Sequence, residues 1–322
     1  MEGIAMVNLS KLTTEKRNKN TYDIDSLDSL GIIKKINEED KQVAYEIEKH
    51  LEEIALVIDD VVKSFLEGGR LIYIGAGTSG RLGILDAVEC PPTFSVDYEQ
   101  VQGLIAGGEK AFIKAVEGAE DNKELAIKDL KAINLSNKDT LIGLSASGRT
   151  PYVVSGIEYG NKIGAKTASI ATSLNSEIGK IAKKKIEVVA GAEVLTGSTR
   201  LKSGTAQKMI LNMISTASMI QMGKVYENLM IDVNPTNEKL VARALSIIQD
   251  ITKVEKEEAA LKLKQYKTVK KTIFHLLTKE ESLEKIDYYL EKNHGHLRKA
   301  IASYGKKCWF KKWCLYFKRY IQ

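Results

Sequence analysis

The sequence is poor in cysteine and proline, and it has no long apolar run near its start. Among 322 residues it holds 3 cysteines and 4 prolines. So small a set of cysteines cannot build a disulfide framework, and the C-x5-C spacing of Cys308 and Cys314 matches no familiar zinc knuckle, so we expect no structural metal. The polar N-terminus lacks a signal-peptide core, and no later segment stays uncharged long enough to span a membrane. We therefore expect a cytoplasmic protein.

Its excess positive charge is concentrated at the C-terminus. The chain carries 48 basic and 42 acidic residues, a net charge of +6, and the segment 305–322 holds 6 of the basic residues and no acidic one. Without this segment, 48 − 6 = 42 basic residues face 42 acidic ones. Because the rest of the chain is balanced, its charge gives no indication of nucleic-acid binding.

Short apolar segments alternate with helical ones along most of the chain. A long amphipathic helix is predicted over 37–66, and strands are predicted over 70–74, 139–144, 166–171 and 186–190. Each of these strands runs into a loop and a helix, which predicts a doubly wound, mostly parallel α/β sheet. After Pro235 glycine becomes rare and leucines and isoleucines recur at helical spacing, which predicts a small C-terminal all-helical domain. The expected divisions are an arm over 1–36, the α/β domain over 37–234, the helical domain over 235–302 and a basic aromatic tail over 303–322.

Two strand ends carry loops rich in glycine and hydroxyl groups. The first, Gly75-x-Gly77-x-x-Gly80, fits the dinucleotide fingerprint, with Asp97 near the position of a ribose-binding acid. However, Thr78 and Ser79 place hydroxyls inside it, and the loop 145–150, Ser-Ala-Ser-Gly-Arg-Thr, follows a second strand. A terminal monophosphate has free oxygens for hydroxyls and helix N-terminal amides, so two such loops favour a sugar monophosphate. The alternative is that both loops are only turns and caps.

Seven ordered blocks between Leu12 and Ile301 give the chain a specific resemblance. They are GAGTSGRLG at 75–83, ECPPT at 89–93, GLIAGG at 103–108, AVEGAED at 115–121, SASGRTPY at 145–152, TGSTRLKSGTAQK at 196–208 and TNEKL at 236–240. In these blocks the chain closely resembles N-acetylmuramic acid 6-phosphate etherases. The resemblance implies a sugar-isomerase (SIS) fold, a C-terminal helical domain, a homodimer, no cofactor, and cytoplasmic recycling of cell-wall amino sugars.

The resemblance also implies roles for individual residues. Glu89 is the expected acid/base that protonates the leaving lactyl oxygen and later activates water, and Glu120 is the expected base that removes the C2 proton of an open-chain sugar. Glu117 shares a local pattern with Glu120, so a swapped assignment is the main alternative. The 6-phosphate and the sugar hydroxyls are expected to bind Thr78, Ser79, Gly80, Ser145, Ser147 and Thr150.

Other residues near the motifs have two interpretations each. Arg149 and Lys202 either contribute charge near the phosphate or the lactyl carboxylate, or they form structural ion pairs. Cys90 follows Glu89, but an elimination needs no covalent intermediate, which favours a small buried cysteine over a nucleophile.

The chain departs from the family pattern at two places. Val88 stands where a small, serine-like residue is expected before Glu89. The tail from Tyr304 to Gln322 extends past the usual end, and its aromatics are interleaved with lysines. A tail without function is favoured over a helix lying on a membrane surface.

Three other functions remain open from the sequence alone. They are a non-catalytic sugar-phosphate sensor, an aldose–ketose isomerase on the same fold and, ranked last, a dinucleotide-dependent oxidoreductase. The presence of both glutamates favours the etherase over the sensor.

Overall fold

The structure is a computed structural model that describes residues 15–114, 116–233 and 238–305. These residues form two compact units. The first unit runs to Cys90 and from Asp97 to Ala217, and the second comprises Pro91–Val96 and the residues from Ser218 onward. The predicted division between 234 and 235 lies outside the described residues, as does most of the predicted tail, so the four-part division stays a prediction.

A parallel sheet lies at the centre of the first unit. Its 5 strands have the order β2-β1-β3-β4-β5. Their bounds are β1 Leu71–Gly75, β2 Val101–Ile105, β3 Thr140–Ser145, β4 Lys166–Ala171 and β5 Lys184–Glu187. Every pairing is parallel, which confirms the predicted doubly wound fold.

Helices precede, connect and follow these strands. Their bounds are α1 Ser29–Glu48, α2 Leu51–Leu66, α3 Gly77–Phe94, α4 Glu109–Ile113, α5 Lys123–Ala132, α6 Pro151–Lys162, α7 Glu177–Ile181 and α8 Lys202–Gln221, after short 3-10 turns at Lys19–Thr21 and Ile24–Ser26. The single helix predicted over 37–66 is two helices, because the chain turns at Lys49 and His50. Asp28 starts α1 earlier than predicted by accepting the amide of Gly31 at 2.8 Å.

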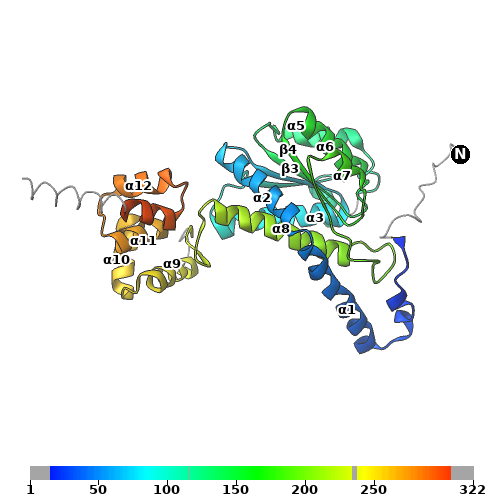
Figure 1. The fold of residues 1–322 in the computed structure, drawn as a ribbon, viewed down its shortest axis with the longest axis horizontal. Coiled ribbons are helices and arrows are strands. Elements are labelled where there is room, and N and C mark those ends of the chain that lie inside the picture. Colours follow the sequence, from blue (N-terminus) through cyan, green and yellow to red (C-terminus); the bar gives the residue numbers. More distant parts are fainter. Residues whose placement is uncertain (1–14, 115, 234–237, 306–322) are drawn as a thin grey trace, which may run out of the picture. The chain divides into compact units, whose positions relative to one another are not determined.

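Helices cover both faces of the sheet. Successive side chains of a strand point to opposite faces, so the helices that contact two adjacent residues of β1 lie on different faces. Gly83 of α3 lies against Tyr73, whereas Gly156 of α6 lies against the next residue, Ile74. Figure 1 shows α5, α6 and α7 on one side of the sheet and α2, α3 and α8 on the other. A buried core that includes Ile72 and Leu141 fills the space between the sheet and the α5–α6 layer.

Strands β1 and β3 lie at the point where the winding of the sheet reverses. From β1 the chain moves to β2 on one side, and from β3 it moves to β4 on the other. In open α/β sheets, ligands bind in the crevice at the carboxyl ends of two such strands. Gly75, the last residue of β1, pairs with Leu144 of β3, so the loops that follow the two strands begin side by side.

The second unit is a small helical domain, as predicted, with a short hairpin before it. Its elements are β6 Val225–Tyr226, β7 Leu229–Met230, α9 Glu238–Thr252, α10 Lys256–Tyr266, α11 Val269–Thr278 and α12 Leu283–Lys292. The side chains of Ile248, Phe274 and Tyr289 are among those that form its core. Within the described parts of both units, no helix is long and apolar enough to cross a membrane.

Candidate active site at the carboxyl ends of two neighbouring strands

The loop after β3 gathers hydroxyl groups. Ser145 Oγ lies 2.8 Å from Thr150 Oγ1 and 3.4 Å from Ser147 Oγ, and it accepts the amide of Gly148 at 3.0 Å. Thr172 and Ser173 both donate to the carbonyl of Ala146, at 3.0 and 3.2 Å. Ser145 is buried, whereas Ser147 and Thr150 are partly exposed. The structure therefore brings the predicted hydroxyls of this loop together and holds them in place.

The loop after β1 presents main-chain amides instead. It leads directly into α3, which begins at Gly77. The amides of Gly77, Thr78 and Ser79 have no main-chain acceptor among the described residues, while Gly80 N bonds Ala76 O at 3.2 Å. Free amides at the start of a long helix form an anion site. The side chain of Ser79 is buried and donates to Gln207 Oε1 at 2.8 Å, so its hydroxyl ties α3 to α8.

Glu120 lies beside the loop of hydroxyls. Its carbonyl accepts the amide of Tyr152 at 2.9 Å, which joins the Glu120 backbone to the first turn of α6. Both Glu120 and Glu117 are exposed in the single chain. Asn122 then caps α5 by accepting the amide of Leu125 at 3.0 Å. Glu120 stands three residues before α5, in the segment that connects α4 to α5. This position in the sequence brings its backbone to the start of α6, beside the end of β3.

Glu89 lies far along α3. It is exposed and stands twelve residues after Gly77, which corresponds to about 18 Å along the helix axis. Asp86, one turn earlier, accepts hydrogen bonds from Tyr73 in the middle of β1, at 2.9 Å, and from Ser215 of α8, at 3.0 Å. Burial raises the pKa of Asp86, and these two hydrogen bonds oppose the rise. Within one chain, therefore, Glu89 is not brought to the loops that hold the other predicted site residues.

Arg81 connects the two segments that carry the glutamates. From the first turns of α3 it donates through Nε to Phe112 O and through Nη2 to Ala111 O, both at 2.8 Å. These carbonyls end the short helix α4, where helical carbonyls lack internal partners. The sequence shows Arg81 inside a motif but indicates no role for it, since no local pattern signals a contact with a carbonyl 30 residues away.

Of the two interpretations of Lys202, the structure supports the structural ion pair. Its Nζ lies 2.7 Å from Glu39 Oε2, and both side chains are buried. Burial alone would raise the pKa of Glu39, but hydrogen bonds from Lys202, Asn20 and Asn18 outweigh it and lower that pKa. The pair fastens α1 to the first turn of α8 and has no free charge for a ligand.

Cys90 is buried behind Glu89. Burial, reinforced by the nearby carboxylate of Asp86, raises the pKa of its thiol to about 12. A thiol with such a pKa is protonated and unreactive at neutral pH. The structure therefore supports the small buried cysteine over the nucleophile.

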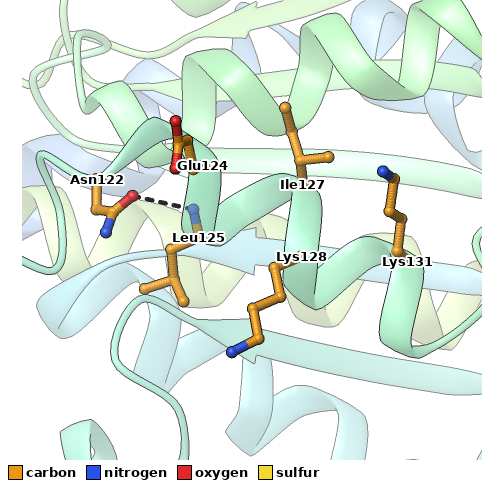
Figure 2. Close-up of a pocket in the computed structure, with 6 residues that line it drawn as sticks. All are labelled: Asn122, Glu124, Leu125, Ile127, Lys128 and Lys131. Atoms are coloured by element: carbon orange, nitrogen blue, oxygen red, sulfur yellow. Dashed lines mark hydrogen bonds between the residues drawn. The ribbon is translucent and has the colours of Figure 1, made fainter.

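A cavity of about 510 Å³ lies on α5. Figure 2 shows the residues that line it: Asn122, Glu124, Leu125, Ile127, Lys128 and Lys131. All of them belong to one helix and its N-cap, and none is a predicted site residue. We therefore place the candidate site at the ends of β1 and β3 and not in this cavity. Among the described residues, no group of His, Cys, Asp or Glu side chains is arranged to hold a metal ion.

Comparisons with known proteins show which proteins the chain is similar to. Residues 53–161 match the family model described as the N-terminal SIS domain of glucokinase regulatory protein, and residues 227–291 match the model of its C-terminal lid domain. An N-acetylmuramic acid 6-phosphate etherase from Bacillus cytotoxicus is 56% identical over 294 residues, which cover 91% of this chain and 100% of that protein. One from Clostridium botulinum is 54% identical over 300 residues, covering 92% of this chain and 98% of that protein. Among solved structures, an E. coli CFT073 protein in complex with A5P matches with a TM-score of 0.48 and 17% identity, over 63% of this chain and 97% of that one.

Proposed function

The chain belongs to the N-acetylmuramic acid 6-phosphate etherase family, and from this premise we propose that Glu89 and Glu120 carry out its reaction. The reaction is cleavage of the D-lactyl ether of N-acetylmuramic acid 6-phosphate, which gives N-acetylglucosamine 6-phosphate and D-lactate. One observation carries the assignment of the site: the Glu120 backbone is bonded to the helix that starts at the loop of hydroxyls, at the switch point of the sheet.

The 6-phosphate binds between the two loops. The amides at the start of α3, from Gly77 to Ser79, offer partial positive charge, and the hydroxyls of Thr78, Ser145, Ser147 and Thr150 offer further donors. Ser79 contributes its backbone amide, while its hydroxyl is held by Gln207. Gly80, whose amide bonds Ala76 O, contributes through its missing side chain, because a Cβ there would lie 2.8 Å from Gly75 O. A phosphate monoester has enough free oxygens to use both loops at once. No cofactor is needed for this binding or for the chemistry below.

The two carboxylates divide the proton transfers between them. In the open-chain sugar the C1 aldehyde acidifies the hydrogen on C2, and Glu120 removes that proton. The electron pair of the C2–H bond becomes the C2=C3 double bond, the C3–O bond breaks, and Glu89 donates its proton to the departing lactyl oxygen. Glu89, now a carboxylate, takes a proton from water that adds to C3, and C2 regains a proton from Glu120.

We propose that a homodimer brings together the two glutamates, which lie far apart within one chain. Paired carboxylates that act across one bond in glycosidases stand about 5 to 10 Å apart, whereas Glu89 lies about 18 Å along α3 from the loop of its own chain. Leu85, one turn before Glu89, and Val88, next to Glu89 in the sequence, are 46% and 49% exposed. We place Glu89 of the partner subunit in the site formed by Glu120 and the two loops, with these apolar side chains in the interface. We also place the enzyme in the cytoplasm, as expected for a family that acts on a charged sugar phosphate.

The proposal is tested by product analysis in water enriched in oxygen-18. We expect the purified chain to release D-lactate and to place the heavy oxygen at C3 of the sugar. Glu89→Gln and Glu120→Gln should each lower the rate by about 100-fold or more, while the matched surface change Glu124→Gln on α5 should not. A sugar-phosphate isomerase would release no lactate. Lactate without heavy oxygen at C3 would contradict elimination and rehydration.

A further inference from the structure

Arg149 occupies a fixed position inside the loop of hydroxyls. The preceding residue, Gly148, has φ +70, and a Cβ on it would lie 2.2 Å from the Cβ of Ser176. Gly148 O also accepts the amide of Ile178 at 3.0 Å. The backbone at Arg149 therefore has little freedom, and only its side chain remains adjustable.

The guanidinium of Arg149 is uncommitted. The side chain is partly buried, yet among the described residues it has no hydrogen-bond or ion-pair partner. An arginine fork is suited to bidentate binding of a carboxylate or phosphate. Two other cations of the surrounding motifs are already engaged, Arg81 by the carbonyls of α4 and Lys202 by Glu39.

The substrate of the proposed reaction has two anionic groups, a phosphate and a carboxylate. We expect different donors of the loops to bind each of them. The phosphate on C6 is served by helix amides and hydroxyls, which are neutral donors. The lactyl carboxylate hangs from C3, next to the C2 proton that Glu120 removes. Arg149 stands three residues before Tyr152, whose amide is bonded to the Glu120 carbonyl. Arg149 therefore stands between the phosphate-binding hydroxyls of this loop and the first turn of α6 that is bonded to Glu120, so its long side chain can serve an anion on the Glu120 side of the sugar.

We infer that Arg149 binds the carboxylate of the lactyl group and so makes the site specific for a lactyl ether over an unsubstituted amino-sugar phosphate. This inference rests on the proposed function. Arg149 is a specificity residue for the substrate and takes no part in the proton transfers.

The product lacks the lactyl group but keeps the phosphate, and this difference provides the test. For Arg149→Gln we expect kcat/KM for N-acetylmuramic acid 6-phosphate to fall about 10- to 100-fold, while the inhibition constant of N-acetylglucosamine 6-phosphate stays within about 2-fold of wild type. Arg149→Lys should lie between the two, because it keeps the charge and loses the fork. Lys131→Gln on α5, which removes the same charge from an exposed position, should change neither value.

The possible outcomes separate the inference from the function it rests on. An inhibition constant that worsens by the same factor as kcat/KM would assign Arg149 to the phosphate or to loop structure and would overturn the inference. Unchanged kinetics would overturn it as well. Absence of lactate release by the wild-type chain would instead contradict the proposed function. Equal thermal unfolding of Arg149→Gln and wild type verifies that the variant is folded.

Discussion

The loops after β1 and β3 look alike in sequence but differ in what they present to a ligand. Both are built from glycine and small hydroxyl residues at neighbouring strand ends. In the loop after β1, Ser79 is buried against Gln207 and the free donors are amides of α3. In the loop after β3, Ser145, Ser147 and Thr150 cluster, while the amides of Tyr152, Val153 and Val154 already have main-chain acceptors. One loop offers a helix terminus and the other offers hydroxyls, so the two complement each other around one phosphate.

The largest expected difference between the loops concerns their glycines. Gly77 and Gly148 both have positive φ, +52 and +70, but a Cβ at Gly77 meets nothing within 4 Å, whereas one at Gly148 overlaps Ser176. Ser176 cannot move freely because its hydroxyl and amide both bond Glu187, at 2.8 and 2.9 Å. Gly77→Ala should cost about 1–2 kcal/mol for its backbone conformation, and Gly148→Ala about 2–5 kcal/mol, because overpacking is added. Urea unfolding measures both, and equal losses would contradict the difference.

Substitution of Ser145 should mainly weaken substrate binding, whereas substitution of Ser79 should mainly lower the stability of the fold. Ser145→Ala removes a donor to the phosphate, so KM for the sugar phosphate should rise about 10-fold or more. Its loss of stability should be smaller than that of Ser79→Ala, because the Gly148 amide keeps its bond to Ser145 O at 3.1 Å. Ser79→Ala leaves Gln207 Oε1 buried without its donor, and Gln207 Nε2 already lacks a partner in the described part of the chain. Its free energy of unfolding should therefore fall by about 1–3 kcal/mol. Steady-state kinetics and thermal unfolding of both variants provide the comparison, and the reverse pattern would refute it.

Arg81 should affect the chemical step more than substrate binding. Its two hydrogen bonds hold the end of α4, from which the chain continues to Glu120. Arg81→Gln should lower kcat about 10-fold, as expected for a displaced base, with KM nearly unchanged. It should also increase the isotope effect with substrate deuterated at C2. Lys110→Gln, an exposed change on α4, is the control. A rise in KM alone would mean that Arg81 binds substrate instead.

The smallest effect is expected at Cys90. With a thiol pKa of about 12 in the folded protein, the reactive thiolate forms only far above neutral pH. At pH 8.5, alkylation of Cys90 by iodoacetamide should be about 100-fold slower than in the unfolded chain, and Cys90→Ser should retain activity. Peptide mass spectrometry distinguishes Cys90 from the two tail cysteines. Rapid labelling of folded protein, with loss of activity, would restore the nucleophile interpretation.

The sequence was informative wherever a local pattern decides the structure. The loop positions of Ser145, Ser147 and Thr150 followed from apolar strands ending in polar turns, and β4 was predicted at its observed bounds. Strand β2 was not predicted, because Gln102 and Gly103 interrupt its apolar run at the edge of the sheet. The inward turn of Ser79 and the pairing of Lys202 with Glu39 arise from contacts between distant segments. Local periodicity contains no information about such contacts.

Mixing two inactive variants tests most directly whether Glu89 and Glu120 serve one site across a dimer. Glu89→Gln and Glu120→Gln chains are mixed under conditions that allow the subunits to exchange, and D-lactate release is compared with that of each variant alone. A mixed dimer contains one site in which both glutamates are intact, so activity should return to a substantial fraction of wild type. If mixed dimers form and no activity returns, Glu89 and Glu120 do not act in a site shared between two subunits, and the proposed division of the proton transfers across the dimer is contradicted.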